Sequence, residues 1–166
     1  MAERQVQILM GSDSDAPVMR KAIGVLDTLG ITSQMTVASA HRSPDRVQRI
    51  LEEAPSEGVK VFIVGAGAAA HLAGVVAAHS TLPVIGVPID SSPLKGWDAL
   101  LATVQMPPGV PVATVSVGGA GAVNAAVLAA QILALSDPRI ASALADYKAA
   151  LADKVERAAA KLEDQA

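Results

Sequence analysis

The chain alternates between short apolar runs and helical segments, and this pattern most limits the folds that it can adopt. The apolar runs lie at residues 6–10, 31–38, 59–64, 83–87 and 111–117. They are mostly continuous in hydrophobicity and do not alternate between apolar and polar residues, which is typical of strands buried on both faces. Such strands, separated by helices, predict a three-layer, doubly wound α/β fold around a parallel sheet.

Proline and glycine mark the ends of the expected helices. The first helix is expected from Pro17 to about Leu29, with Asp15 as its N-cap and Gly30 directly after its end. The next three are expected to open at 43–45, to span 69–79, and to span 122–135. If the strands take the flavodoxin-like order 2-1-3-4-5, the loops after the first three strands meet at one crevice, where open α/β sheets bind ligands.

A last helix is expected over residues 137–166, and it carries a long apolar stripe. The stripe consists of Ile140, Leu144, Tyr147, Leu151, Val155 and Leu162. It either packs against its own domain or covers a neighbouring subunit; the length of the stripe favours the subunit. At 166 residues with 51% hydrophobic content, residues 1–166 are expected to form a single domain.

The overall charge and composition disfavour several kinds of partner. The formal net charge is −3 and no run of lysine or arginine occurs, so we expect no nucleic acid to bind. We expect no membrane association, because no uninterrupted apolar run approaches the roughly 18 residues that a spanning helix needs. The N-terminus does not resemble a secretion signal, and the lack of cysteine fits a reducing compartment. A cytoplasmic protein is therefore expected.

Three polar or glycine-rich loops follow the first three strands, at residues 11–15, 39–44 and 65–71. In the second loop, His41 lies beside Arg42. An imidazole exchanges protons near neutral pH, whereas a guanidinium together with helix N-termini binds a phosphate or carboxylate. The carboxylates of Asp13 and Asp15 would repel that anion unless one of them faces sugar hydroxyls, which suggests a phosphorylated ribose as ligand.

The histidines also have purely structural interpretations. His41 either transfers protons or caps the second helix, and His71 either contacts ligand or satisfies a backbone carbonyl. His79 is most simply a cation that the C-terminal end of a helix favours. The serines at 12, 14, 39 and 43 stand at helix starts, where N-capping is common.

The third loop also imitates a dinucleotide-binding fingerprint. It reads Gly65-x-Gly67-x-x-Ala70, with Asp90 at the end of the following strand. That interpretation leaves His71 and the two serine- and aspartate-bearing loops without a role, and the fingerprint normally belongs to the first strand of its unit, so we do not favour it. The sequence has no phosphate-binding Gly-Lys-Ser/Thr motif and no histidine or carboxylate pair with persuasive metal spacing. We expect neither ATP hydrolysis nor a metal site.

Five ordered motifs together resemble the PurE family of purine biosynthesis. They are Gly11-Ser12-Asp13-Ser14-Asp15, Ser39-Ala40-His41-Arg42-Ser43-Pro44, Ala70-His71-Leu72, Val104-Gln105-Met106-Pro107 with residues 109–114, and residues 121–126. The resemblance implies a flavodoxin-like subunit of a homo-octamer that acts on carboxylated 5-aminoimidazole ribonucleotide. The Gln-Met-Pro segment and residues 94–98 resemble the bacterial mutase branch, which uses no ATP, metal or other cofactor. The alternatives are the carboxylase branch, which uses CO2 directly, and a non-catalytic nucleotide-binding module.

The same resemblance implies roles for individual residues. His41 matches the general acid/base of the family, and Ser12, Asp15 and Arg42 match substrate-binding positions. Further candidates for substrate binding are Asp13, Ser14, Ser39, Gly67, Ala68, His71 and Leu72. Ala68 and Ala73 depart from the glycine and proline usual in the family, which puts the rate and the placement of the carboxylate in doubt more than the type of reaction.

Overall fold

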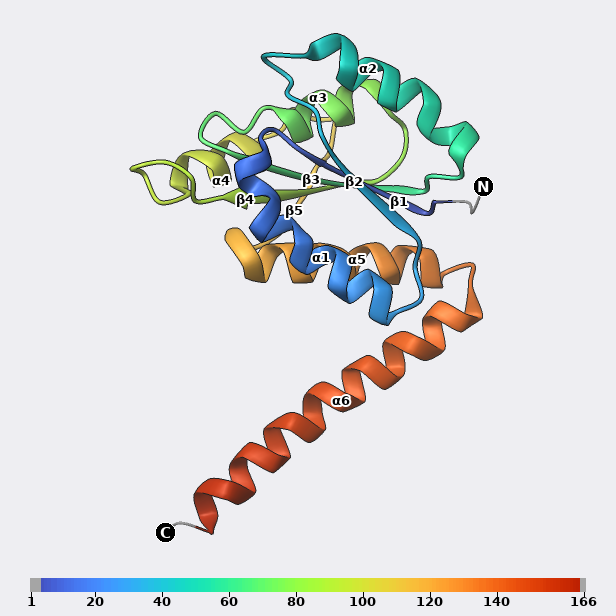
Figure 1. Ribbon diagram of the computed structural model, residues 1–166, viewed down its shortest axis with the longest axis vertical. Coiled ribbons are helices and arrows are strands. Elements are labelled where there is room, and N and C mark those ends of the chain that lie inside the picture. Colours follow the sequence, from blue (N-terminus) through green and yellow to red (C-terminus); the bar gives the residue numbers. More distant parts are fainter. Residues whose placement is uncertain (1–3, 165–166) are drawn as a thin grey trace.

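Five parallel strands form one sheet in the computed structural model, which describes residues 4–164 (Figure 1). The strand order is β2-β1-β3-β4-β5, as the sequence predicts. The last residue of β1, Met10, pairs with Val37 on one side and Gly65 on the other, so the carboxyl ends of these strands meet at one edge. The strands are β1 (Val6–Met10), β2 (Ser33–Val37), β3 (Val61–Gly67), β4 (Val84–Ile89) and β5 (Ala113–Thr114).

Helices cover both faces of the sheet, as expected for a doubly wound fold. In Figure 1, α1 and α5 lie on one face, and α2, α3 and α4 lie on the other. The helices are α1 (Ala16–Thr28), α2 (Pro44–Glu53), α3 (Leu72–His79), α4 (Trp97–Val104), α5 (Gly118–Ala134) and α6 (Pro138–Glu163), with 3-10 turns η1 (Asp13–Asp15) and η2 (Ala54–Glu57). Among residues 4–164, no helix combines the length and apolarity needed to cross a membrane.

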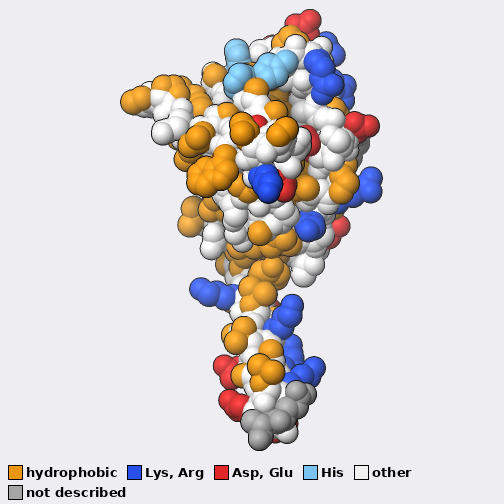
Figure 2. Space-filling model, turned by 90° about the vertical axis from the view of Figure 1, so that its left-hand side faces the viewer, with side chains coloured by type: hydrophobic (Ala, Val, Ile, Leu, Met, Phe, Trp, Pro, Cys, Tyr) orange, Lys and Arg blue, Asp and Glu red, His pale blue; other side chains and the backbone are white. Residues whose placement is uncertain are grey.

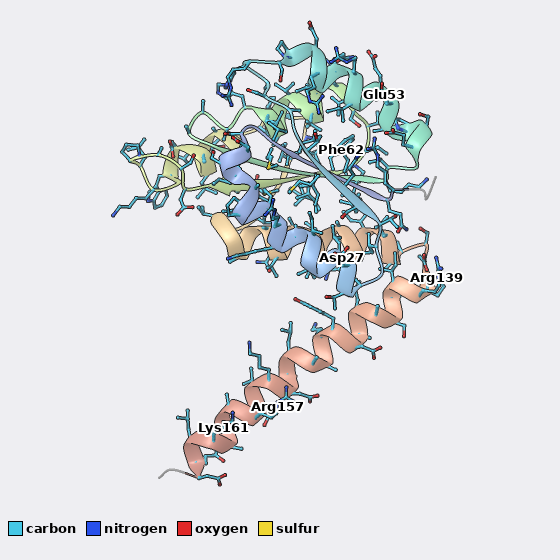
Figure 3. All side chains as sticks on the ribbon, viewed as in Figure 1. Asp27, Glu53, Phe62, Arg139, Arg157 and Lys161 are labelled. Carbon is cyan, nitrogen blue, oxygen red and sulfur yellow. The ribbon has the colours of Figure 1, made fainter. Side chains whose placement is uncertain are left out.

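The two faces of the sheet bury separate cores. Ile8 of β1 points toward α1 and α5, where it packs with Met19, whereas the next residue, Leu9, joins the core of the other face. Phe62 fills that second core under α2 and α3 (Figure 3). The first core relies on five fully buried alanines of α5, at positions 122, 125, 126, 129 and 130. Because alanine is small, α5 approaches the sheet and α1 closely.

Several element boundaries differ from the sequence predictions. No helix was expected between residues 87 and 111, yet α4 lies there and carries exposed Trp97 and Leu101. Strand β5 has two residues in place of the expected seven, and β2 is shorter than 31–38 and only partly buried, because it is an edge strand. Helix α5 begins at Gly118 and not near Ala122, whereas α3 begins at Leu72 and not at Ala69.

The last helix packs on its own domain only near its start. Asp137 caps it by accepting a hydrogen bond from the Arg139 backbone N–H at 2.9 Å. Ile140 is buried, and Leu144 and Tyr147 pack against the α1–α5 core. Beyond them, Leu151, Val155 and Leu162 are 51%, 65% and 71% exposed. Figures 1 and 3 show this distal part, which includes the labelled Arg157 and Lys161, extending away from the domain.

Residues 165 and 166 of the expected final helix lie outside the described residues, as do residues 1–3 of the expected domain. Large hydrophobic side chains are exposed in two groups, and also singly at Leu135. The two groups are Leu94, Trp97, Leu101 and Val104 on and before α4, and Leu151, Val155 and Leu162 on α6. Figure 2 shows orange side chains gathered on the α4 side of the domain and continuing along α6.

Two helical glycines provide a matched test of the close packing. A Cβ at Gly121 would overlap the Ser116 carbonyl oxygen, a backbone atom that cannot rotate away, whereas a Cβ at Gly24 would meet nothing within 4 Å. We expect Gly121→Ala to lower the free energy of unfolding by about 1–3 kcal/mol, as overpacking does. Gly24→Ala should raise it by about 0.5–1 kcal/mol, because alanine loses less backbone entropy in a helix. Urea unfolding at one fixed protein concentration measures both, and equal shifts would contradict the packing argument.

Candidate active site

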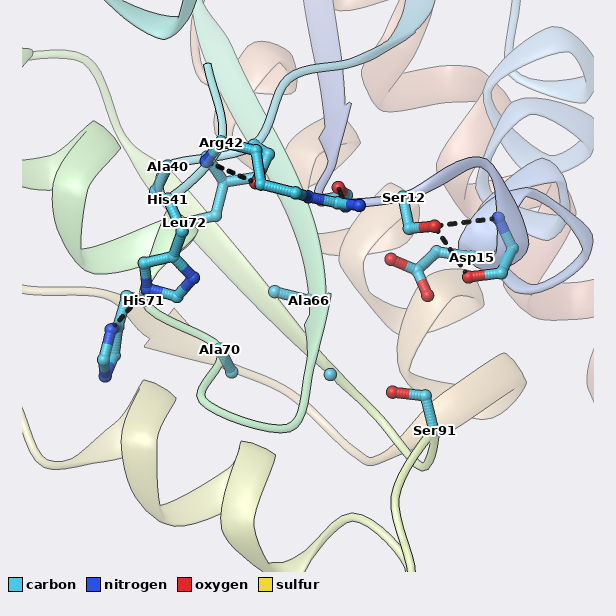
Figure 4. Close-up of a pocket in the computed structure, with 14 residues that line it drawn as sticks. Ser12, Asp15, Ala40, His41, Arg42, Ala66, Ala70, His71, Leu72 and Ser91 are labelled. Carbon is cyan, nitrogen blue, oxygen red and sulfur yellow. Dashed lines mark hydrogen bonds between the residues drawn. The ribbon is translucent and has the colours of Figure 1, made fainter. Parts of the chain in front are cut away.

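A crevice lies at the carboxyl edge of the sheet, where the three loops identified from the sequence meet (Figure 4). Its volume is about 180 Å³. The loops after β1, β2 and β3 supply most of its lining, because the winding of the sheet reverses beside β1 and β3. Of the candidate residues, those lining the crevice are Ser12, Ser14, Asp15, Ser39, His41, Arg42, Gly67, His71 and Leu72.

Two candidates do not line this crevice. Asp13 lines an adjoining hollow, which shares Ser12, Ser39 and Arg42 with the crevice. Ala68 lines neither, and its backbone has a positive φ of 51°, a left-handed conformation that disfavours a residue with a Cβ. Ala68 therefore affects the crevice through the shape of its loop.

The loop after β1 is held by the Ser12 hydroxyl. Its Oγ accepts hydrogen bonds from the Ser14 backbone N–H at 3.4 Å and from the Ser14 hydroxyl at 2.9 Å. The same hydroxyl lies 3.2 Å from Oδ1 of Asp13. Ser12 thus caps the short η1 turn, whereas Asp15, expected as the N-cap of α1, makes no side-chain capping hydrogen bond. The structural role of Ser12 coexists with its place in the crevice.

Arg42 links the loops after β1 and β2. Its Nη2 donates to the Gly11 carbonyl oxygen at 2.7 Å, and its Nε donates to Oγ of Ser39 at 3.4 Å. Ser39 Oγ also accepts from the Arg42 backbone N–H at 3.2 Å. A guanidinium has five N–H donors, so Arg42 keeps donors for an anion after making these contacts. Figure 4 shows its side chain reaching across the crevice toward Ser12.

Ser43 stands at the N-cap position of α2 but does not cap that helix with its side chain. Its hydroxyl instead accepts from the Ser39 backbone N–H at 3.1 Å and lies 3.2 Å from the Ser39 carbonyl oxygen. The Ser43 hydroxyl therefore closes the turn from Ser39 to Ser43, and His41 is at the centre of this turn. This turn fixes the backbone that carries the imidazole.

The rings of His41 and His71 contact each other at the crevice rim. Nε2 of His41 lies 2.8 Å from Nδ1 of His71, and the rings meet edge to face with centroids 4.9 Å apart. Both side chains are exposed in this single chain. His71 immediately precedes α3, but its side chain makes no capping hydrogen bond. His41 likewise does not cap α2, which begins after Ser43.

Asp15 is the buried carboxylate of the crevice, with 5% of its surface exposed. Burial raises its pKa, because a charged carboxylate loses hydration there. A hydrogen bond with the Ser12 backbone and the positive charge of Arg42 oppose this shift, and the negative charge of Asp13 adds to it. Asp15 is therefore costlier to keep ionised than an exposed aspartate.

Sequence reasoning missed one lining residue that lies beyond the three loops, namely Ser91, which follows β4. A Cβ on Gly67 would overlap Oγ of Ser91, so the glycine makes room for this hydroxyl. The position of Ser91 in the sequence could have identified it, because the carboxyl end of the fourth strand lies at the same edge of the sheet as those of the first three. Gly11, Ala40, Ala66 and Ala70, inside the identified loops, also line the crevice.

Comparisons with known proteins agree on one family. A family model described as AIR carboxylase matches residues 5–154, which include every crevice residue. The N5-carboxyaminoimidazole ribonucleotide mutase of Bacillus subtilis is 55% identical over 139 residues, covering 84% of this chain and 86% of that protein. The protein of the same name from Pyrococcus horikoshii is 48% identical over 159 residues, covering 96% and 89%. The crystal structure of Treponema denticola PurE matches with a TM-score of 0.87 at 32% identity, covering 96% of this chain and 98% of that one.

The raised pKa of Asp15 gives a pH-dependent stability prediction. An aspartate whose folded pKa exceeds its ordinary value of 3.8 costs no stability below that pH, and destabilises the fold as the pH rises through the folded pKa. We expect Asp15→Asn to unfold at a higher temperature than the unsubstituted protein at pH 7, with the difference vanishing below about pH 4.

Thermal unfolding between pH 3.5 and 8 measures this difference. Asp27→Asn is the matched control, because Asp27 is an exposed aspartate near the opposite end of α1. A stability difference for Asp15→Asn that stays constant over the whole pH range would refute the burial argument.

Proposed function

The chain belongs to the AIR carboxylase family, and we propose that it is an N5-carboxyaminoimidazole ribonucleotide mutase, an isomerase of purine biosynthesis. It moves a carboxylate from N5 to C4 of the aminoimidazole ring. The observation that carries this proposal is the meeting of His41, Arg42 and the Ser12–Asp15 loop at one crevice, in a chain about half identical to curated mutases. The reaction requires no ATP, metal or other cofactor.

Arg42 and the loop after β1 bind the phosphate of the ribonucleotide. The free guanidinium donors of Arg42 face the same hollow as Ser12, so a phosphate there receives charge-assisted hydrogen bonds. Asp15 lies deeper in the crevice and accepts hydrogen bonds from ribose hydroxyls. These hydroxyls replace part of the hydration that burial removes from its carboxylate.

His41 carries the proton in both halves of the reaction. As an imidazolium, it protonates N5 while the N5–C bond of the carbamate breaks, which leaves a free amine and CO2. The ring carbon C4 then attacks CO2, and neutral His41 removes the C4 proton, which restores the aromatic imidazole. One histidine therefore returns to its starting state, and the proton balance closes without a second acid.

The loop after β3 retains CO2 between the two steps. Gly67 and Ala70 line the crevice without large side chains, so CO2 fits close to C4. A molecule held in contact with its partner reacts as if at very high concentration, which replaces the need for dissolved CO2. Leu72 supplies an apolar wall on the same side.

Two other functions remain to be tested against the mutase. The family description names a carboxylase, which would take CO2 from solution to give the same product. A non-catalytic nucleotide-binding module would use the same crevice without proton transfer. The curated relatives named above carry the mutase name, which favours the mutase.

An isotope experiment separates these functions. The protein is mixed with N5-carboxylated substrate and 13C-bicarbonate, without ATP, and the C4 product is analysed by mass spectrometry. The mutase forms unlabelled product, the carboxylase forms labelled product, and the binding module forms none. His41→Asn should lower the rate at least about a hundredfold while the protein stays folded. Labelled product, or a normal rate in this variant, contradicts the proposed mechanism.

We further propose that the enzyme is a cytoplasmic homo-octamer. Exposed His41 and His71 leave the rim of the crevice uncovered in a single chain. A neighbouring subunit would complete its walls. The exposed distal stripe of α6 supports contact between subunits, because an isolated chain would leave Leu151 and Val155 in water.

Charge placed on that stripe should weaken the assembly. We expect the double substitution Leu151→Glu and Val155→Glu to lower the molecular mass measured by light scattering, because a buried glutamate loses hydration. Leu135→Glu is the control, since Leu135 is 88% exposed and lies before α6. An unaltered mass in the double variant would rule out subunit docking through the stripe.

A further inference from the structure

The contact between His41 and His71 joins two loops that lie 30 residues apart in sequence. The distance of 2.8 Å between Nε2 of His41 and Nδ1 of His71 is that of a hydrogen bond. One of these nitrogens must therefore donate and the other accept. Nδ1 of His41 makes no hydrogen bond within residues 4–164, so it is the ring nitrogen left for a substrate.

Both rings are carried by tight turns. The turn under His41 is closed by the Ser43 backbone N–H, which donates to the Ser39 carbonyl oxygen at 2.9 Å. The turn before His71 is closed by the Ala70 backbone N–H, which donates to the Gly67 carbonyl oxygen at 3.0 Å. Ala70 has a positive φ of 38° in this turn. An alanine held in that conformation is strained, and strain of this kind is concentrated at functional sites.

We propose that His71 is a positioning residue that holds His41 in the tautomer carrying hydrogen on Nε2. His41 Nε2 donates to His71 Nδ1, which leaves His41 Nδ1 bare and directed to the substrate. This inference rests on the proposed function, in which neutral His41 removes the C4 proton. A general base held by a third group is a recurrent arrangement, since the third group fixes both the orientation and the tautomer of the imidazole.

The hydrogen bond also serves the acid half of the reaction. When His41 carries two protons, its Nε2–H is a stronger donor, and His71 Nδ1 continues to accept from it. The transferred proton therefore enters and leaves at Nδ1 alone, and the Nε2 proton stays in place. His71 itself exchanges no proton with the substrate.

Substitutions of His71 distinguish this role from simple packing. The side-chain amide of asparagine reaches the position of a histidine Nδ1, so His71→Asn retains an acceptor for His41. Glutamine places its amide nearer the Nε2 position, and leucine offers no acceptor. We expect His71→Asn to keep kcat within about threefold, and His71→Gln and His71→Leu to lower it about tenfold or more with little change in KM.

His79 gives the matched control. It is exposed at the end of the same helix, α3, and forms no described contact with the crevice. His79→Leu should leave both kcat and KM unchanged. If His71→Asn loses as much activity as His71→Leu, or if the loss falls on KM alone, His71 contacts the substrate and does not act through His41.

A second readout is independent of turnover. The chain has three histidines, so 15N-histidine labelling and solid-state NMR of sedimented protein can resolve each ring, with assignments from single substitutions. At alkaline pH we expect His41 to show a protonated Nε2 and a bare Nδ1. His71→Leu should mix the two tautomers, whereas His71→Asn should retain the single one.

The opposite tautomer of His41, or a tautomer unchanged by His71→Leu, would overturn the proposal. These results do not depend on the reaction. If the NMR result holds while no isomerisation is detected, the positioning contact stands and the proposed function fails.

Discussion

Parallel pairing of β1 with both β2 and β3 is the constraint on which the rest of the molecule depends. It brings the carboxyl ends of three successive strands to one edge, so that loops far apart in sequence share a small volume. The pairing requires both faces of the sheet to be covered, and the chain achieves this with alanine-rich α5 and with short helices on the opposite face. Few large side chains are needed, because small residues allow the layers to approach closely.

The crevice that results is organised before any ligand binds. Arg42 donates to the Gly11 carbonyl oxygen, and the Ser43 hydroxyl closes the Ser39–Ser43 turn, so the groups proposed to bind the phosphate are already oriented. Asp15 differs from these donors: its carboxylate is buried, and the loss of hydration raises its pKa. A site that holds donors in place and keeps one acceptor under-solvated favours a ligand bearing both a phosphate and hydroxyl groups.

The sequence predicts the strands and the three loops because both depend on local patterns, whereas the strand order is expected from the fold class and the family resemblance. Strands such as β1 are apolar throughout, and glycine and proline mark the ends of the neighbouring helices. The pattern misses α4, because this helix has only eight residues and two of its apolar residues, Trp97 and Leu101, stay exposed. The contact of His41 with His71 and the position of Ser91 are not encoded locally. Each depends on how two loops approach each other, and only the fold sets that approach.

Two parts of the single chain, the distal end of α6 and the rim of the crevice, remain uncovered. Helix α6 buries Ile140 and then extends its apolar stripe into solvent, while His41 and His71 at the rim of the crevice are exposed. Exposed apolar surface is costly in water, and in the proposed mechanism an open site would let CO2 escape before C4 attacks it. Association of subunits would remedy both. The proposed octamer would therefore couple assembly to catalysis, because burial of the α6 stripe would hold together the walls of the crevice.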